Sequence, residues 1–128
     1  MNNIALGCVA VLGLLLFGLG LSVSMMRFRE RTTAGCADDP ADLLHKLVRA
    51  HGNTAEYAPF LAVLFLFLGA RSPSTVTVSL MVIATLCRCL LVVGLVAFPT
   101  MAKPNPFRFV GAIGTYGAGI ALCLALMR

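Results

Sequence analysis

Polar side chains recur at helical spacing in one stretch of an otherwise apolar chain. Arg49, Asn53 and Glu56 lie at positions i, i+4 and i+7, which places them on one face of a helix. His45 and Tyr57 extend this stripe in both directions. Arginine binds carboxylates bidentately, and Glu56 can accept an ammonium group. The stripe therefore predicts a site for a small anion that also carries an amine.

A further charge, Arg88, lies in the middle of an apolar segment. Glu56 and Arg88 are each about 15–17 residues from the turn at residues 71–74, or about 24 Å along a helix, so we expect them at the same depth. Ionisable groups inside a membrane cost about 2.5–3.5 kcal/mol each on insertion scales. Glu56 and Arg88 therefore either form a buried ion pair that fixes helix register or face a water-accessible site.

Three more residues are candidates for the binding site, and each also has a simpler structural explanation. Arg108 begins the last apolar segment and can be an interfacial anchor, a common role for arginine near helix ends. Tyr116 lies two turns later on the same face, where it either supplies a hydroxyl to a bound molecule or packs as an aromatic ring. His51 lies off the polar stripe and can be an interface residue.

The elements that position these residues are predicted to be membrane-spanning helices. The chain is 59% hydrophobic and 12% charged, whereas soluble domains carry about 25% charged residues. Apolar segments long enough to cross a bilayer predict helices at about residues 4–26, 40–70, 75–98 and 105–127. Asp39 and Pro40 have the residue types of a helix start. We expect a single-domain, all-α, antiparallel four-helix bundle.

Charge distribution predicts the orientation of the bundle. Lys and Arg near helix ends favour the cytoplasmic side. The end of the bundle that holds the loops after the first and third helices has seven such residues and the opposite end has two, so we expect these two loops in the cytoplasm, in a bacterial inner membrane. The seven are Arg27, Arg29, Arg31, Lys46, Arg49, Lys103 and Arg108, and the two are Arg71 and Arg128.

Other functional classes find little support in the sequence. A nucleic-acid site would show clustered basic residues with interleaved aromatics, whereas the cations after the first helix form a membrane flank. Cys87 and Cys89 point to different sides of a helix, so they make a poor metal site, and we expect no bound metal. A transporter would need a polar path across the bundle, and the first helix offers only Ser22 and Ser24.

Residues 49–59, Arg-Ala-His-Gly-Asn-Thr-Ala-Glu-Tyr-Ala-Pro, resemble the second-helix signature of the MAPEG family. These are membrane-associated proteins in eicosanoid and glutathione metabolism, and they include microsomal glutathione transferases, leukotriene C synthase, prostaglandin E synthase and many bacterial members. The resemblance spans nearly the whole chain. Other positions similar to the family are Arg27, Asp39-Pro40, Arg88 with Gly94, and Pro104-Asn105-Pro106 with Arg108.

The resemblance implies a homotrimer that binds glutathione between neighbouring subunits near the cytoplasmic face. It implies that Arg108 stabilises the glutathione thiolate and that His51 contacts the tripeptide. The other residues that it assigns to glutathione are Arg27, Arg49, Asn53, Glu56, Tyr57 and Arg88.

The chemistry of such a site is thiolate attack on a lipophilic small molecule that enters from the membrane lipid. A free thiol has a pKa of about 8.5, and lowering it by about two units takes about 2.7 kcal/mol, which a nearby guanidinium can supply. Leu91, Val93 and Leu95 stand where other family members have tyrosines or a histidine. Two interpretations follow from the resemblance: a glutathione transferase or peroxidase, and a non-catalytic scaffold that binds lipid or glutathione.

Overall fold

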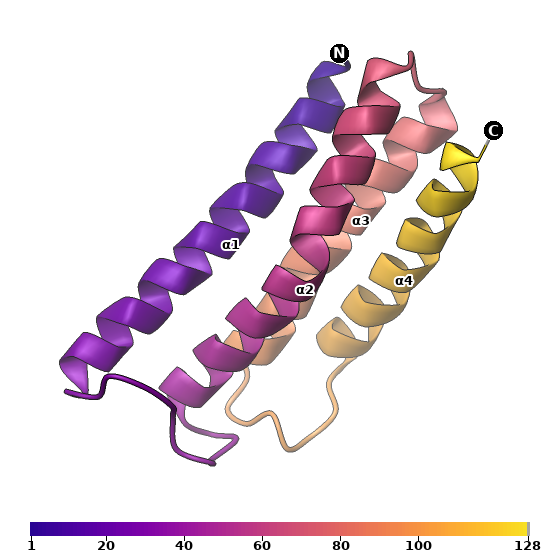
Figure 1. Cartoon of the computed structure of the whole chain (residues 1–128). Coiled ribbons are helices and arrows are strands. Elements are labelled where there is room, and N and C mark those ends of the chain that lie inside the picture. The colour runs from indigo at the N-terminus through magenta and orange to yellow at the C-terminus, as the bar shows by residue number, and fades with distance from the viewer. Residues whose placement is uncertain (128) are drawn as a thin grey trace.

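Four helices make up the fold of the computed structural model, which describes residues 1–127. The helices are α1 (Asn3–Arg29), α2 (Leu43–Ala70), α3 (Thr75–Val96) and α4 (Pro106–Leu126). They run antiparallel, and both termini lie at the same end as the turn between α2 and α3 (Figure 1). The all-helical prediction is therefore confirmed. All four helices are long and apolar enough to cross a membrane.

Helix starts follow from side chains that satisfy free backbone N–H groups. Asn2 caps α1, Ser74 caps α3, and Asn105 caps α4, where Pro106 takes the first helical position. The expected start of the second helix at Pro40 is wrong by three residues, because Asp42 rather than Asp39 is the cap. The carbonyl oxygen of Pro40 instead accepts a hydrogen bond from the backbone N–H of Met101, at 2.9 Å.

The helices pack mainly as two pairs. α1 packs on α2 and α3 packs on α4, whereas α2 and α4 touch over only a short stretch. Apolar side chains of all four helices form a buried cluster that includes Leu12, Leu61, Phe65, Met81 and Leu122. Because α4 leans on α3 rather than on α2, a space remains between α2 and α4, and the site described below is built around it.

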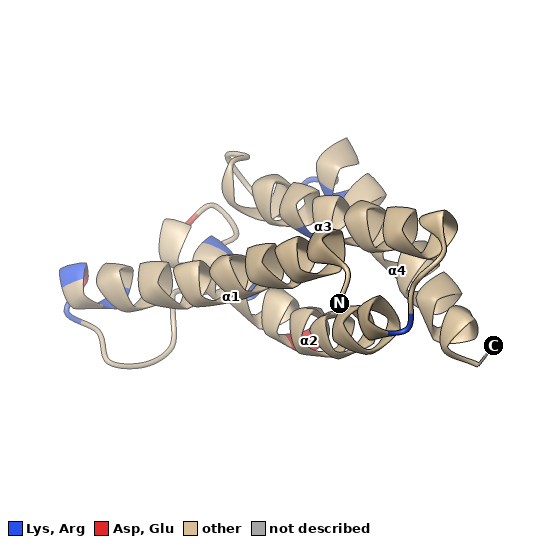
Figure 2. Ribbon diagram, turned by 90° about the horizontal axis from the view of Figure 1, so that it is seen from above, with Lys and Arg blue, Asp and Glu red and all other residues tan. Residues whose placement is uncertain are grey.

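The outer surface is apolar over most of its length. Leu14 and Phe17 of α1, for example, are 75% and 77% exposed. Such residues face lipid or another subunit, since water would make the surface unstable. Figure 2 shows most Lys and Arg residues toward the end of the bundle that carries the two long loops. The polar end of the molecule is thus the loop end.

Candidate functional site

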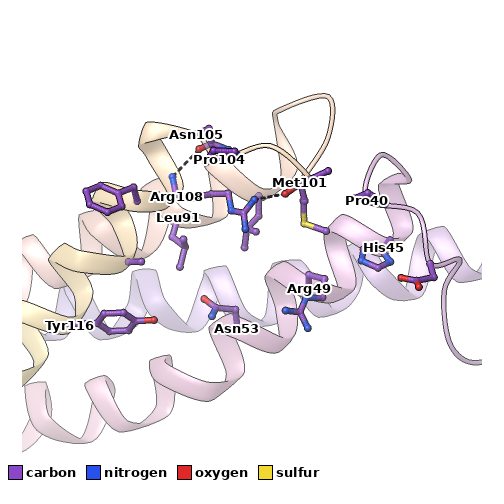
Figure 3. A pocket seen from close by; sticks show the side chains of 15 residues that line it. Pro40, His45, Arg49, Asn53, Leu91, Met101, Pro104, Asn105, Arg108 and Tyr116 are labelled. Atoms are coloured by element: carbon purple, nitrogen blue, oxygen red, sulfur yellow. Dashed lines mark hydrogen bonds between the residues drawn. The ribbon is translucent and has the colours of Figure 1, made fainter.

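A hollow of about 700 Å³ opens at the loop end, between α2, α4 and the loop that joins α3 to α4. Figure 3 shows Arg108 on one side of this hollow and Arg49 and Asn53 on the other. The volume is typical of sites for small molecules. We call it the cationic hollow, and its polar lining consists of Asp38, His45, Arg49, Asn53, Asn105, Arg108 and Tyr116.

The structure brings part of the polar stripe together with two residues of the last helix, whereas Glu56 and Tyr57 of the stripe lie outside the cationic hollow. Arg49 and Asn53 line the cationic hollow from α2, and Arg108 and Tyr116 line it from α4. His45 also lines it, but Nδ1 of its ring lies 2.7 Å from the carbonyl oxygen of Ala37. A carbonyl can only accept, so Nδ1 carries the hydrogen and donates it to the loop. His45 therefore anchors the first loop to α2.

Arg108 is held in place by the start of its own helix. The Asn105 side chain accepts from the backbone N–H of Arg108 at 2.9 Å and donates to the carbonyl oxygen of Gly94 in α3, also at 2.9 Å. The Arg108 guanidinium donates to the carbonyl oxygen of Met101 at 2.7 Å. An arginine has five N–H donors, so one bond to Met101 leaves others for a ligand.

Contacts between the two loops close the rim of the cationic hollow. Met101 uses its carbonyl oxygen to accept from Arg108 and its N–H to donate to Pro40, so it connects both loops. Lys46 is buried, and its ammonium group donates to the carbonyl oxygen of Phe98 at 3.1 Å. The loops thus close the loop end of the site, while α2, α3 and α4 form its walls.

Arg88 lies behind the cationic hollow and is only 1% exposed. Its guanidinium donates to the side-chain oxygen of Asn53 at 2.7 Å and to the Asn53 backbone carbonyl oxygen at 3.1 Å. The guanidinium carbon also lies 5.1 Å from the centre of the Tyr57 ring, within cation–π range. Arg88 therefore supports Asn53 and Tyr57, and it does not line the hollow.

Of the two alternatives for Glu56 and Arg88, the structure contradicts the buried ion pair. Glu56 is exposed, and within residues 1–127 no hydrogen bond or ion pair joins it to Arg88, whose acceptor is Asn53. Depth alone did not decide the partner. Glu56 follows Asn53 by three residues, which is slightly less than one turn of helix. Its side chain therefore points about 60° away from that of Asn53 around the axis of α2. That rotation carries Glu56 out of the face that packs against α3.

A second hollow continues along the space between α2 and α4 toward the termini. It has a volume of about 510 Å³ and a mainly apolar lining. The rings of Tyr57 and Tyr116 meet at its loop-side end, with centroids 5.8 Å apart. We call it the apolar groove; its lining includes Glu56, Tyr57, Phe60, Leu61, Leu64, Tyr116 and Ile120.

Two predicted residues lie elsewhere, in a hollow of about 620 Å³ between α1 and α2. Arg27 and His51 line this α1–α2 hollow. The His51 ring lies so close to α1 that a side-chain carbon added to Gly20 would come within 3.2 Å of its Nε2 atom. Nε of Arg27 is buried and has no hydrogen-bond partner among residues 1–127. The predicted site residues thus fall on two different faces of the chain.

Sequence reasoning missed the contributions of the loops. Asp38 and Met101 line the cationic hollow, yet neither follows a helical period that could have revealed it. The only signal was the density of prolines between residues 99 and 106, which predicts a stiff loop. Met101 acts through its backbone, and a backbone contact leaves no mark on residue type.

Comparison with known proteins identifies the family of this chain. The family model of the MAPEG family matches residues 5–128. The chain belongs to the MAPEG family. No curated protein and no solved structure matches it. As a MAPEG protein with four apolar helices, the chain is an integral membrane protein.

MAPEG proteins generally form trimers and use glutathione, and the family contains both glutathione-related transferases or peroxidases and non-catalytic members. The cationic hollow and the apolar groove of this MAPEG chain fit a ligand set of one polar anion and one apolar molecule. Among residues 1–127, no group of three or more His, Cys, Asp or Glu side chains could hold a metal ion.

Proposed function

We propose that this protein binds glutathione and transfers it to hydrophobic electrophiles, or uses it to reduce them, by thiolate attack. The observation that carries this proposal is the cationic hollow, in which Arg49 and Arg108 face each other at the end of a membrane bundle. Glutathione has two carboxylates, an ammonium group and a thiol. Two guanidinium groups with an amide between them suit its carboxylates.

Arg108 is the candidate catalytic residue. It is half-buried and already oriented by Met101, so its remaining N–H donors need little reorganisation to stabilise a thiolate. Preorganised donors are the most effective way to stabilise a developing charge. The electrophile would reach the sulfur from the apolar groove, which lies next to the cationic hollow along α4. Attack at an electrophilic carbon gives a thioether, either by expelling a leaving group or by adding to an activated double bond that then takes up a proton. Attack on a peroxide breaks the O–O bond and releases an alcohol, and a second glutathione completes the reduction by forming glutathione disulfide.

The proposed assembly is a homotrimer with the glutathione site between subunits. Arg27 and His51 lie in the α1–α2 hollow, away from Arg49 and Arg108. A neighbouring subunit that brought its α1–α2 hollow against the cationic hollow would unite these groups. Glu56 supports the proposed binding of glutathione. A carboxylate in the lining of an apolar groove costs free energy unless a group of opposite charge covers it. The ammonium of glutathione is such a group.

We further propose that both long loops face the cytoplasm of a bacterial cell, with the protein in the inner membrane. Most cations of the chain gather at the loop end, as Figure 2 shows, which is the pattern of cytoplasmic loops. This orientation opens the cationic hollow toward the compartment that holds reduced glutathione.

The test is the ultraviolet absorbance of the thiolate when glutathione is added to the purified protein. We expect a thiolate signal in the wild type and its loss in Arg108→Ala. Lys103→Ala is the matched control, since Lys103 is a cation of the same loop region that does not line the cationic hollow. An unchanged signal in Arg108→Ala would show that another group stabilises the thiolate.

A non-catalytic scaffold is the second candidate function. Helix α3 contributes Leu91 and Leu95 to the cationic hollow, so that wall offers no hydroxyl or imidazole for catalysis. A scaffold would bind glutathione, measured by calorimetry, without any thiolate signal. The same two measurements on the wild type therefore separate the two functions.

A further inference from the structure

One side chain belongs to both cavities between α2 and α4. Among the described residues, Tyr116 alone lines the cationic hollow and the apolar groove. Its side chain is 48% exposed, so the ring lies in the open space rather than in the core. Any ligand that has a polar part in the cationic hollow and an apolar part in the apolar groove must pass this ring.

The ring that Tyr116 leans on cannot easily give way. Tyr57 lies against it with the ring planes inclined at 44°, and the Arg88 guanidinium covers the Tyr57 ring. Arg88 is in turn fixed by its two hydrogen bonds to Asn53. On this side of the junction, the half-buried Tyr57 ring is held against the buried guanidinium of Arg88. The width of the passage depends on the side chain at position 116.

We propose that Tyr116 is a specificity-determining residue whose bulk sets the width of the apolar group that can join a molecule bound in the cationic hollow. This inference rests on the proposed glutathione site. It assigns a steric role to the ring of Tyr116, which limits the size of the apolar group. A hydrogen bond from the Tyr116 hydroxyl would instead affect the binding of glutathione itself. A smaller residue admits wider apolar groups and a larger residue excludes them.

Glutathiones that carry an apolar group on sulfur test this role by binding, without any need for turnover. The probes are S-hexylglutathione, which has a narrow chain, and S-(1-naphthylmethyl)glutathione, which has a wide ring system; calorimetry gives the ratio of their affinities. We expect Tyr116→Ala to shift this ratio about tenfold toward the wide probe and Tyr116→Trp to shift it about tenfold toward the narrow one. Tyr116→Phe keeps the ring and should change the ratio less than about twofold.

Ile113→Ala is the matched control, because Ile113 is exposed on α4 and lines neither cavity. If the Ala and Trp variants share one ratio, or if Ile113→Ala shifts it equally, the inference is overturned. If the wild type binds neither unsubstituted glutathione nor the probes, the proposed function fails and this inference fails with it. If the wild type binds glutathione but the ratio of the two probe affinities does not change with the residue at position 116, only the inference is overturned and the proposed function stands.

A second measurement covers the case in which Tyr116→Ala does not fold. The chain contains no tryptophan, so Tyr116→Trp introduces a single fluorescent reporter at the junction. S-(4-nitrobenzyl)glutathione carries a quenching nitroaryl group and should quench the tryptophan at position 116. Ile113→Trp should keep its fluorescence under the same conditions. Equal quenching at both positions would contradict the placement of Tyr116 beside the apolar group.

Discussion

At the level of single residues, the site depends on how one buried charge is held, since only Nη2 of Arg88 is bonded and its buried Nε has no hydrogen-bond partner within residues 1–127. Arg88 is almost fully enclosed, and both its hydrogen bonds go to Asn53. Asn53 also lines the cationic hollow. The same amide therefore compensates a buried guanidinium on one side and faces the ligand site on the other. This arrangement couples the stability of the α2–α3 contact to the geometry of the site.

Removing the Asn53 side chain should therefore destabilise the protein more than neutralising Glu56. Asn53→Ala leaves the Arg88 guanidinium with only the backbone acceptor, and we expect a loss of about 2–3 kcal/mol. Glu56→Gln, at an exposed position, should cost less than about 0.5 kcal/mol yet abolish glutathione retention. Thermal unfolding in detergent and calorimetry measure the two effects. A reversed order of stability would mean that Glu56 is the partner of Arg88.

Residue spacing predicted part of this arrangement. The spacing of Arg49 and Asn53 placed them correctly on the face that lines the cationic hollow. It also suggested Glu56 as the partner of Arg88, because spacing fixes depth and face within one helix. How far a helix rotates about its axis against its neighbour depends on packing in three dimensions. The sequence of one helix does not specify that rotation, so Asn53 was not predicted as the hydrogen-bond acceptor of Arg88.

At the scale of elements, close contact between α3 and α4 sets the position of Arg108. A side-chain carbon added to Gly94 would lie 2.7 Å from the backbone nitrogen of Arg108 and 2.8 Å from its Cγ atom. Glycine therefore allows the start of α4 to rest directly on α3, where Asn105 bonds to the Gly94 carbonyl. Hydropathy predicted the helices themselves. It did not predict how closely α3 and α4 approach, because that distance depends on Gly94 having no side chain.

Gly94→Ala should displace the start of α4 and weaken thiolate stabilisation. The added methyl group meets backbone that cannot rotate away, so we expect a loss of about 1–3 kcal/mol in stability and a weaker thiolate signal. Gly117→Ala is the control, since nothing lies within 4 Å of the added carbon. It should be neutral or stabilise the protein by up to about 1 kcal/mol. Equal behaviour of the two variants would refute a positioning role for Gly94.

At the scale of the whole molecule, the chain offers its candidate groups on two faces. The α1–α2 hollow holds Arg27 and the cationic hollow holds Arg49, and α2 lies between them. A closed homo-oligomer with head-to-tail contacts brings two different faces of identical subunits together. Each proposed site then takes Arg27 from one subunit and Arg49 from its neighbour. The sequence alone could list both arginines, and only the structure separates them.

Mixed oligomers test this division directly. Arg27→Ala and Arg49→Ala should each lose glutathione binding when expressed alone. The Arg27→Ala subunit keeps Arg49, and the Arg49→Ala subunit keeps Arg27. In a random equal mixture, about a quarter of the interfaces take Arg49 from the first variant and Arg27 from the second, and only these sites have both arginines. Co-expression should therefore restore about a quarter of the wild-type binding capacity, measured by calorimetry on the purified mixture. A site within a single subunit would give no recovery.

The matched mixture combines Arg49→Ala with Arg108→Ala, and both mixtures are also followed by the thiolate signal, which Arg108→Ala is expected to lack and which Arg27→Ala and Arg49→Ala lose with glutathione binding. Both residues line the same cationic hollow, so no subunit in this mixture has the pair intact, whichever neighbour it meets. Recovery only in the mixture with Arg27→Ala would place Arg27 across a subunit boundary from Arg49 and Arg108. Recovery in both mixtures would mean that Arg49 and Arg108 reach a shared site from different subunits, and the cationic hollow of one chain would then no longer account for glutathione binding.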